Sequence, residues 1–290
     1  MDAAKCRAFL YAAEGGSFTA AAERMDYTQS GITRMIGSLE DELGFPLFVR
    51  SKKGVVLTEN GREMMPLIRD IVSAHETAEQ MSCEIRGLYR GTINIGSYFA
   101  ISAMWMPQIL KVFGARYPGI RIRLREGGNA KISRWLRERS ADCCFCGKPD
   151  PETADWIPLY RDEMVVWLPE DHPMARARSY PPAMLADESF IHTDPGEDTD
   201  QDRLLEKWGV KPDTKFTTRD GFATYNMVAK GIGVSFNQRL ISEDWHGAVA
   251  LVPFDPPEYV TLGIAVPSLK ECSPAAKKLI ETAREVIFPH

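Results

Sequence analysis

A group of polar side chains near the N-terminus has the chemistry needed to read a nucleic acid. The group consists of Gln29, Ser30, Thr33 and Arg34, with Thr28 immediately before it. Glutamine can hydrogen-bond adenine through two contacts, arginine can bind guanine or hold a phosphate, and hydroxyl groups mostly hold phosphates. At these spacings the side chains share one face of a helix. We therefore expect this face to contact double-stranded DNA.

The elements around this group have the form of a helix-turn-helix. Residues 17–25 predict a short helix, residues 26–27 a turn, and residues 28–43 a longer helix that Gly44 can end. A hydroxyl residue stands where each helix needs an N-cap. The buried stripe of the second helix is Ile32, Ile36, Leu39 and Leu43. This leaves the polar group on the opposite face, as in a recognition helix that enters the major groove.

Two short strands are expected directly after the second helix. Residues 45–50 and 51–57 predict strands around a basic turn, which would form a wing beside the helix pair. Arg50, Lys52 and Lys53 would hold the DNA backbone there, because phosphate contacts supply much of the affinity. A small helical bundle with a solvated polar face is the other interpretation of the helix pair, and the wing argues against it.

A long amphipathic helix is predicted after the wing, with Thr58 as its cap. Its apolar residues recur at spacings near three and four: Met64, Ile68, Ile71, Ala78, Met81, Ile85 and Leu88. A narrow apolar stripe of this kind suits a partner helix. We therefore predict a homodimer formed through this helix, with packing onto its own domain as the alternative. Gly87 and Gly91 suggest a hinge at its end.

From Thr92 the pattern changes to alternating strands and helices. Strands are predicted at 92–97, 120–125, 142–146, 164–168, 190–192, near Phe216, at 233–236 and at 261–266. Helices are predicted at 102–117, at 130–139 and after Ser273. This alternation favours largely parallel sheets covered by helices.

The N-terminal motifs resemble those of the LysR-type transcriptional regulators of bacteria. The resemblance is carried by Gly16-Ser-Phe, Ala21-Ala-Glu, Gln29-Ser, Leu39-Glu, Leu43-Gly-Phe-Pro-Leu-Phe-Val-Arg50 and Leu57-Thr-Glu-Asn-Gly61, and it continues more loosely to the C-terminus. It implies a multidomain α+β fold with a winged helix-turn-helix at 1–58, a linker helix that pairs subunits at 59–90, and an effector-binding domain at 91–290. That family often forms dimers of dimers.

The effector-binding domain implied by the resemblance has two α/β lobes of periplasmic-binding-protein type, lobe I at 91–161 and 264–290 and lobe II at 162–263. A small-molecule effector is then expected between the lobes. Ligands of open α/β sheets bind beyond the carboxyl ends of strands, near helix N-termini. This rule selects Ser97, Tyr98, Phe99, Ser102, Asn129, Thr193 and Phe222. These groups suit a small organic carboxylate, whose charge would be met by helix N-termini because the sequence offers no obvious Lys or Arg at those strand ends.

Composition fits a modular cytoplasmic protein. The chain has 290 residues, 44% of them hydrophobic and 26% charged, which allows a small domain and one of ordinary size. No run approaches the roughly 18–20 apolar residues of a membrane span, and the N-terminus lacks a signal-peptide pattern. The net charge of −5 does not favour DNA binding by a single module, so we expect a dimer or a larger assembly.

Neither a metal site nor an enzyme is predicted. Cys143, Cys144 and Cys146 cluster, but successive residues of a strand face opposite sides, so the three thiols do not converge. We expect them to be inert, with Cys146 at the strand end as the most plausible exception. The five histidines show no ligand spacing, and neither a Gly-x-Ser-x-Gly elbow nor a phosphate-binding P-loop occurs.

The sequence therefore predicts a sequence-specific DNA-binding transcriptional regulator controlled by a small-molecule effector. A small-molecule binding protein with a vestigial N-terminal domain is the alternative, and an enzyme built on the two-lobed domain is a third hypothesis. The presence of Gln29, Arg34 and Arg50 favours the regulator, since a vestigial domain would not need them.

Overall fold

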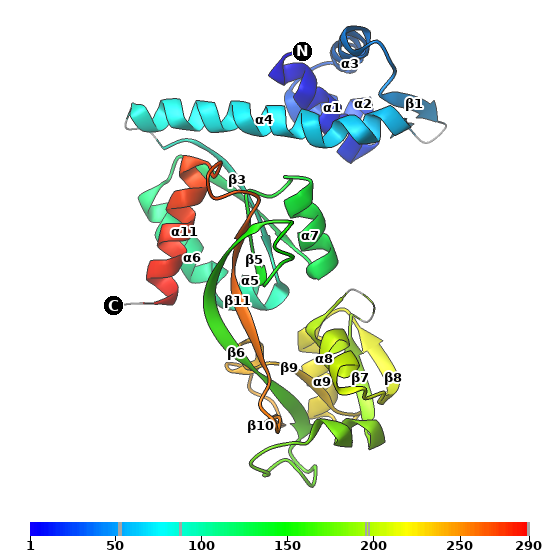
Figure 1. Ribbon diagram of the computed structural model, residues 1–290, viewed down its shortest axis with the longest axis vertical. Coiled ribbons are helices and arrows are strands. Elements are labelled where there is room, and N and C mark those ends of the chain that lie inside the picture. Colours follow the sequence, from blue (N-terminus) through cyan, green and yellow to red (C-terminus); the bar gives the residue numbers. More distant parts are fainter. Residues whose placement is uncertain (52–53, 87–88, 195, 197, 289–290) are drawn as a thin grey trace.

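The computed structural model describes residues 1–51, 54–86, 89–194, 196 and 198–288 (Figure 1). A small helical domain with a wing lies along one long helix, and two α/β lobes follow on the other side of that helix. The described residues include no helix that is both long enough and apolar enough to cross a membrane.

Three helices and a two-stranded wing form the N-terminal domain. They are α1 (Ala3–Gly15), α2 (Phe18–Met25), α3 (Gln29–Leu43), β1 (Phe48–Ser51) and β2 (Gly54–Leu57). The two strands pair antiparallel. The predicted helix-turn-helix and wing are confirmed, whereas α1 was not predicted. Phe9 of α1 is fully buried against the stripe of α3, so this helix completes the core on which α3 rests.

Capping side chains fix the starts of α2 and α3. Ser17 Oγ accepts a hydrogen bond from the backbone N–H of Thr19 at 3.2 Å, and Thr28 Oγ1 accepts one from Gly31 at 3.1 Å. Helix α3 ends at Gly44, whose φ of 83° lies in the left-handed region that glycine tolerates best. The predicted boundaries of the recognition helix therefore follow from local chemistry.

The long helix α4 (Glu59–Ile85) has two apolar faces. Ile68 and Val72 are buried in the core of the N-terminal domain, and Met64 and Ile71 pack against that core. The predicted single dimer stripe was therefore wrong for Ile68, which its own domain covers completely. A second row stays exposed: Leu67, Ala74, Ala78, Met81 and Ile85. A helix of 27 residues extends beyond the small domain. One of its faces therefore packs on that domain, and another face is exposed.

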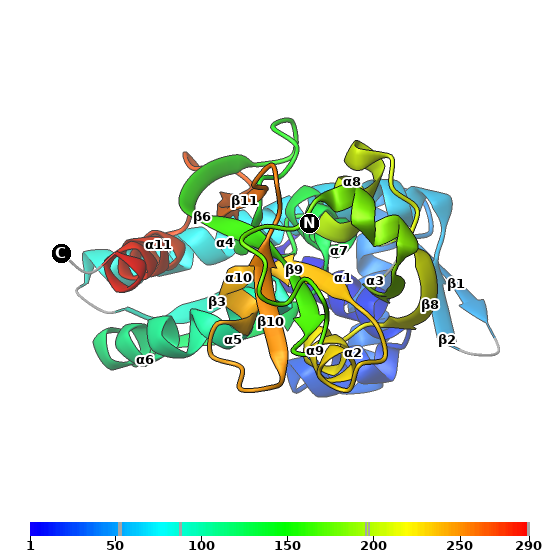
Figure 2. The ribbon, with the colours of Figure 1, turned by 90° about the horizontal axis from the view of Figure 1, so that it is seen from below.

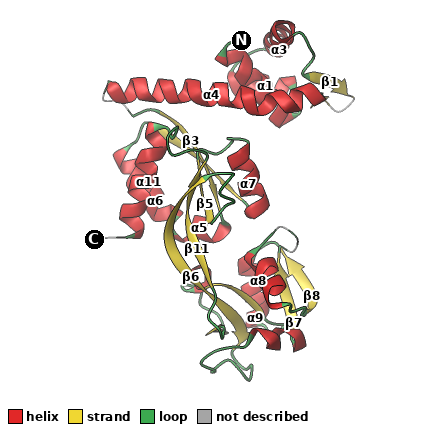
Figure 3. Ribbon diagram, viewed as in Figure 1, coloured by secondary structure: helices red, strands yellow, loops and turns green. Residues whose placement is uncertain are grey.

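Two α/β lobes form the rest of the chain (Figure 3). Lobe I contains β3 (Gly91–Ser97), α5 (Phe99–Met104), α6 (Met106–Arg116), β4 (Ile120–Glu126), α7 (Asn129–Arg137), β5 (Cys143–Gly147) and α11 (Pro274–Ile287). Lobe II contains η1 (Pro182–Asp187), β7 (Ser189–Thr193), α8 (Asp200–Trp208), β8 (Asp213–Thr218), α9 (Gly221–Ala229), β9 (Ser235–Gln238), α10 (Arg239–Ser242) and β10 (Val249–Pro253). Strands β6 (Asp155–Pro169) and β11 (Tyr259–Val266) run from one lobe into the other.

The sheets are mixed rather than largely parallel. β3 pairs parallel with β4 and β5, and β7 pairs parallel with β8, but β11 is antiparallel to both β5 and β6. The order is β10-β6-β11-β5-β3-β4, with β9 on β6. The register of β11 against β6 shifts between Leu262 and Gly263. A Cβ at Gly263 would lie 2.3 Å from the carbonyl oxygen of Ile157, so the connection between the lobes needs glycine here.

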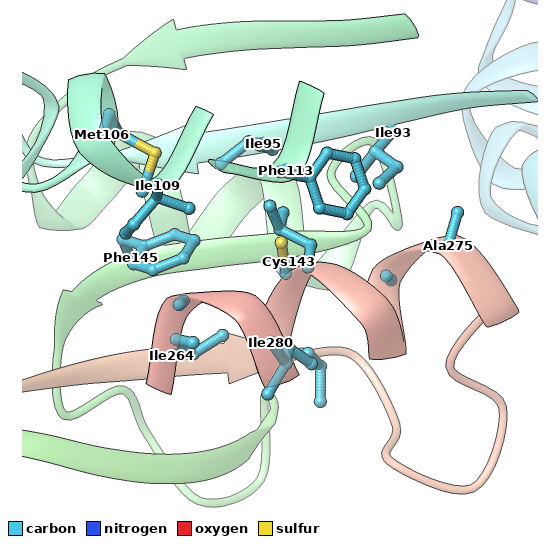
Figure 4. Close-up of a cluster of buried hydrophobic side chains, with 14 of the residues drawn as sticks. Ile93, Ile95, Met106, Ile109, Phe113, Cys143, Phe145, Ile264, Ala275 and Ile280 are labelled. Atoms are coloured by element: carbon cyan, nitrogen blue, oxygen red, sulfur yellow. The ribbon is translucent and has the colours of Figure 1, made fainter. Parts of the chain in front are cut away.

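The core of lobe I holds the ends of its strands in place. Ile93, Ile95, Phe145 and Ile264 pack from the sheet onto α6 and α11, where Phe113 and Ile280 meet them (Figure 4). Seen from below, α6 and α11 lie side by side over this face of the sheet (Figure 2). The carboxyl ends of β3 and β4 consequently share one edge of a rigid layer.

One predicted helix is divided in two. The sequence predicted a single helix at 102–117, but α5 ends at Met104 and α6 begins at Met106, because Pro107 suits the first turn of a new helix. Ser102 therefore lies inside α5 rather than at a helix start. Its hydroxyl oxygen is buried and finds no hydrogen-bond partner among the described residues.

Candidate DNA-binding surface and interlobe pocket

The predicted DNA-contacting residues of α3 lie on its exposed face. Thr28, Gln29, Ser30 and Arg34 are exposed, and Thr33 is half-buried. The hydroxyl of Thr33 donates to the carbonyl oxygen of Gln29 at 2.9 Å, and that of Thr28 caps the helix. The side chains of Gln29 and Arg34 form no hydrogen bond or ion pair with a described residue. Those two are consequently the most available for contacts with DNA.

A carboxylate joins this helix to the wing. Glu40 Oε1 accepts hydrogen bonds from the backbone N–H groups of Leu47 at 2.6 Å and Phe48 at 3.1 Å. This fixes β1 beside the recognition helix. The predicted wing contacts are Arg50, Lys52 and Lys53. The first lies on β1, and the other two lie outside the described residues.

A pocket of about 130 Å³ lies between the two lobes. Lobe I supplies Tyr98, Phe99, Ala100, Gly127, Gly128 and Asn129 to its lining. The remaining lining is Met164, Thr193, Asp194, Thr199, Asp200, Gln201, Arg219, Gly221, Asn237, Gln238 and Ile241. Chain segments that leave the carboxyl ends of β3, β4, β7 and β8 meet here, as the rule for ligand sites in α/β sheets predicts.

The structure brings together some of the predicted effector residues and separates others. Tyr98, Phe99, Asn129 and Thr193 line the pocket. Among the described residues, the lining does not include Ser97, Ser102 or Phe222. Ser97 is buried and donates its hydroxyl to the carbonyl oxygen of Tyr98. Phe222 is exposed and packs edge-on against Trp245, with 5.1 Å between ring centroids.

Asn129 connects the two lobes across the pocket. The Tyr98 hydroxyl donates to Asn129 Oδ1, and Asn129 Nδ2 donates to the carbonyl oxygen of Asp198. Burial raises the pKa of Tyr98 well above its usual value, so the phenol stays protonated and remains a donor. These two bonds link β3 to the segment before α8 and close one side of the pocket.

Helix N-termini at the pocket differ in whether they are capped. Thr199 caps α8 and Asp220 caps α9 with side-chain oxygens. The N-cap residues of α5 and α7, Tyr98 and Gly128, form no side-chain capping hydrogen bond. Because the first N–H groups of a helix have no partner within it, the N-terminus of α7 suits an anionic ligand group.

Lobe II contributes acceptors and one cation that the sequence analysis missed. Asp200 Oδ2 accepts a hydrogen bond from Gln238 Nε2 at 2.7 Å, and burial raises the pKa of Asp200. Arg219 pairs with Asp194 at 3.4 Å and is 84% exposed at the rim. Arg219 directly follows β8, so the strand-end rule selects it once the end of that strand is known. Asp200 follows no strand, and no comparable signal identified it.

The clustered thiols are buried and protonated. Cys143, Cys144, Cys146 and Cys272 are all free and buried. Burial raises the pKa of Cys144 to about 12 and that of Cys272 to about 11, and it holds the pKa values of Cys143 and Cys146 well above the usual range. Since the thiolate is the reactive form, this supports the inert interpretation, including for Cys146. The described part of the chain contains no group of three or more His, Cys, Asp or Glu side chains suited to a metal ion.

A winged helix-turn-helix joined by a long helix to a two-lobed module with an interlobe pocket defines a ligand-responsive DNA-binding protein. Residues 4–62 match the family described as bacterial regulatory helix-turn-helix protein, lysR family, and residues 86–287 match the LysR substrate binding domain. The chain belongs to the LysR family of transcriptional regulators.

Individual relatives agree with this assignment. The chain is 31% identical to the uncharacterized HTH-type transcriptional regulator YvbU of Bacillus subtilis over 289 residues, 99% of each protein. Its fold is similar to that of full-length OxyR from Pseudomonas aeruginosa, with a TM-score of 0.78 at 24% identity over 99% of this chain and 94% of that one. It is also similar to full-length CbnR complexed with its target DNA, with a TM-score of 0.65 at 18% identity over 99% and 100% of the chains.

Family membership settles the general function. The protein is a DNA-binding transcriptional regulator with an effector-binding domain, and its partners are DNA, a small-molecule effector and further copies of itself. The alternative of a binding protein with a vestigial N-terminal domain is not favoured. The relatives are named as regulators rather than as enzymes.

Proposed function

We propose that Gln29, Ser30 and Arg34 contact base edges or phosphates in the major groove. Thr28 and Thr33 lie at the phosphates beside them, with Arg50, Lys52 and Lys53 on the flanking backbone. Support comes from the side chains of Gln29 and Arg34, which are exposed and form no hydrogen bond or ion pair with a described residue. The protein acts as a regulator without catalysing a reaction, and it works in the cytoplasm, where its DNA-binding surface reaches chromosomal DNA.

We propose that the effector is a small molecule with two chemically different ends, bound between the lobes. Its carboxylate faces the N-terminus of α7 in lobe I, which has no side-chain cap, and a hydroxyl or ammonium donor faces Asp200 in lobe II. The observation that carries this proposal is that a helix N-terminus without a side-chain cap lies on the lobe I side of the pocket, while the carboxylate of Asp200 lies on the lobe II side. A pocket of about 130 Å³ suits a molecule near the size of benzene, which fills a cavity of roughly 150 Å³.

A matched ligand series tests this proposal. Thermal unfolding of the full chain should be measured with small carboxylic acids that carry an amino or hydroxyl group and with plain acids of the same size. We expect the bifunctional acids to raise Tm more, because bound ligand stabilises the native state by mass action. Asp200→Asn should remove that preference. Asp198→Asn, whose carboxylate pairs with Arg203 instead, should keep it. Equal responses to both acid classes would contradict the two-ended ligand.

We propose that the chain divides into 1–58, 59–90 and 91–290, with lobe I at 91–161 and 264–290 and lobe II at 162–263. Within this division the exposed apolar row of α4 forms the subunit contact. Ligand binding then changes the angle between the lobes and, through α4, the spacing of the two DNA-binding modules. Such coupling requires that the ligand bind one arrangement more tightly than the other.

A further inference from the structure

A second cavity lies where the N-terminal domain, helix α4 and lobe I meet. Its volume is about 220 Å³, and its walls come from α1, α2, α4, β3, β4 and the segment before β5. Six arginines line it: Arg7, Arg24, Arg69, Arg123, Arg125 and Arg139. The carboxylates in the lining are Glu14, Glu76 and Asp142. The lining of this junction cavity is therefore rich in arginine, with twice as many guanidinium groups as carboxylates.

Four of these arginines have carboxylate partners. The pairs are Arg7–Glu76 at 3.6 Å and Arg7–Glu79 at 3.4 Å, Arg24–Glu14 at 2.7 Å, Arg69–Glu14 at 3.5 Å and Arg69–Glu138 at 3.3 Å, and Arg139–Asp70 at 3.1 Å and Arg139–Glu271 at 2.6 Å. Even so, the buried Nε of Arg7 has no hydrogen-bond partner among the described residues. The Nε–H group of Arg7 is therefore a donor without a hydrogen bond, although Arg7 itself has carboxylate partners.

Arg123 and Arg125 have no carboxylate within ion-pair distance among the described residues. They stand two positions apart on β4, so their side chains leave the same face of the strand. Arg125 is half-buried, lies 4.8 Å from the ring centre of Trp135, and donates to the carbonyl oxygen of Ser140. Burial lowers the pKa of Arg125; the charge of Glu14 opposes this shift, and that of Arg69 adds to it. A half-buried guanidinium that forms no ion pair is unfavourable, and a bound anion would stabilise it.

Asp142 lies near Arg125 and attracts it, but it forms no ion pair with either arginine. Its Oδ2 accepts hydrogen bonds from the backbone N–H of Asn94 at 2.6 Å and from Asn94 Nδ2 at 3.2 Å. Burial raises the pKa of this carboxyl, which weakens it further as a counterion. Glu76 of α4 pairs with Arg7, and its charge also acts on Arg123. Within the described part of the chain, neither Arg123 nor Arg125 therefore has a carboxylate in direct contact, and an anion from outside would supply one.

We propose that the junction cavity binds a small oxyanion of the phosphate type between the N-terminal domain and lobe I. Guanidinium groups present forked N–H donors that match phosphate oxygens, and Arg123 and Arg125 of β4 supply them together with Arg7 of α1. The bound anion bridges α1 and β4 across α4, so it stabilises the arrangement of the DNA-binding domain on the effector domain. This site is separate from both the DNA-binding surface and the interlobe pocket.

Thermal unfolding of the full chain with phosphate, sulfate or chloride at equal ionic strength tests the proposal. We expect a saturable rise in Tm with phosphate and sulfate but not with chloride. Arg125→Gln and Arg123→Gln should each weaken phosphate binding by about tenfold or more, since each removes a charge-assisted contact. Arg121→Gln is the matched control, because Arg121 lies on the same face of β4 but is not in the cavity lining.

Phosphate also resembles a DNA backbone, so an Arg34→Gln variant separates the two surfaces. Retained phosphate binding in Arg34→Gln, with loss in Arg123→Gln, supports the junction site. The opposite pattern would place the ion on the DNA-binding face and overturn the proposal. A phosphate response no larger than that of chloride would overturn it too. A third result would also overturn the proposal: the Arg123→Gln and Arg125→Gln variants form smaller assemblies in sedimentation, and phosphate has no effect. In that case carboxylates of a second subunit would fill the cavity. Comparison of a phosphorylated metabolite mixture with inorganic phosphate alone distinguishes a metabolite from the free ion.

Discussion

The DNA-binding surface and the interlobe pocket achieve recognition by different constructions. The first is a single stretch of helix α3 whose exposed and buried faces follow directly from residue spacing. The second is assembled from segments between Tyr98 and Ile241, which are far apart in the chain. The geometry of a surface on one helix is therefore set by the spacing of its own residues. A pocket between lobes exists only once several strand ends have been brought together.

The largest effect is expected at the contiguous surface. Replacing Gln29 and Arg34 together with alanine should weaken specific DNA binding by at least about thirtyfold, because two side chains that can each discriminate bases by roughly 1–3 kcal/mol are lost. Thermal unfolding and effector binding should stay unchanged, since both side chains are exposed and neither forms a hydrogen bond or ion pair with a described residue. Mobility-shift titration at fixed salt measures the effect. An unchanged affinity for DNA would show that Gln29 and Arg34 of α3 do not form the DNA-binding surface.

The exposed row of α4 links the two sites, so a charge there should separate the subunits. Met81→Asp would place an unpaired carboxylate in the proposed contact and should weaken self-association by at least about tenfold, with a parallel loss of DNA affinity. Met81→Ser is the control, because it removes the same apolar side chain without adding a charge, and it should weaken self-association less. Sedimentation at micromolar concentration is the measurement. Equal behaviour of the two variants would show that this row is not the interface.

The hydroxyl group of Tyr98 allows a test of whether effector binding depends on the hydrogen bonds that link the two lobes. Tyr98→Phe removes the donor to Asn129 and should weaken effector binding by about tenfold, while DNA binding without effector stays as it was. Tyr160→Phe is the control, because Tyr160 lies on β6 outside the pocket lining. Isothermal titration with an effector found in the ligand series gives the affinities. A loss of DNA binding by Tyr98→Phe would mean that the two sites are not separable.

The smallest expected effect is a pH dependence confined to the effector domain. Asp162 is buried and accepts hydrogen bonds from the backbone N–H of Leu240. Burial raises its pKa to about 6, above the ordinary value of 3.8, although those backbone bonds oppose the rise. The folded state therefore holds this proton more tightly. The stabilisation is complete below about pH 4 and is lost as pH rises through about 6.

Asp162→Asn should accordingly remove about 1 kcal/mol of the decline in unfolding free energy between pH 5 and pH 7. Urea unfolding of both proteins at the two pH values gives the change in unfolding free energy with pH for each protein. Subtracting one change from the other cancels the contributions of the other carboxyl groups. A variant with the same slope as the parent would show that Asp162 does not titrate in this range.

Three features of the fold could not be predicted from the local sequence pattern. Helix α1 carries Phe9 into the core, but its pattern is not distinctive until α3 is packed on it. Pro107 divides a helix that periodicity alone joins. Ile68 fits an apolar stripe equally well whether it meets its own domain or a second subunit, and only packing shows that its own domain covers it.

By itself the sequence determined the winged helix-turn-helix, its caps and the polar face of α3, because helix periodicity and capping are local properties of the chain. It also determined the family, through motifs that lie within residues 9–61. Only the tertiary structure decided that Asp200 and Arg219 line the pocket, that Ser97 and Phe222 do not, and that six arginines converge at the domain junction. Those placements depend on strand order and on helices packing from distant parts of the chain, and residue spacing contains no record of either.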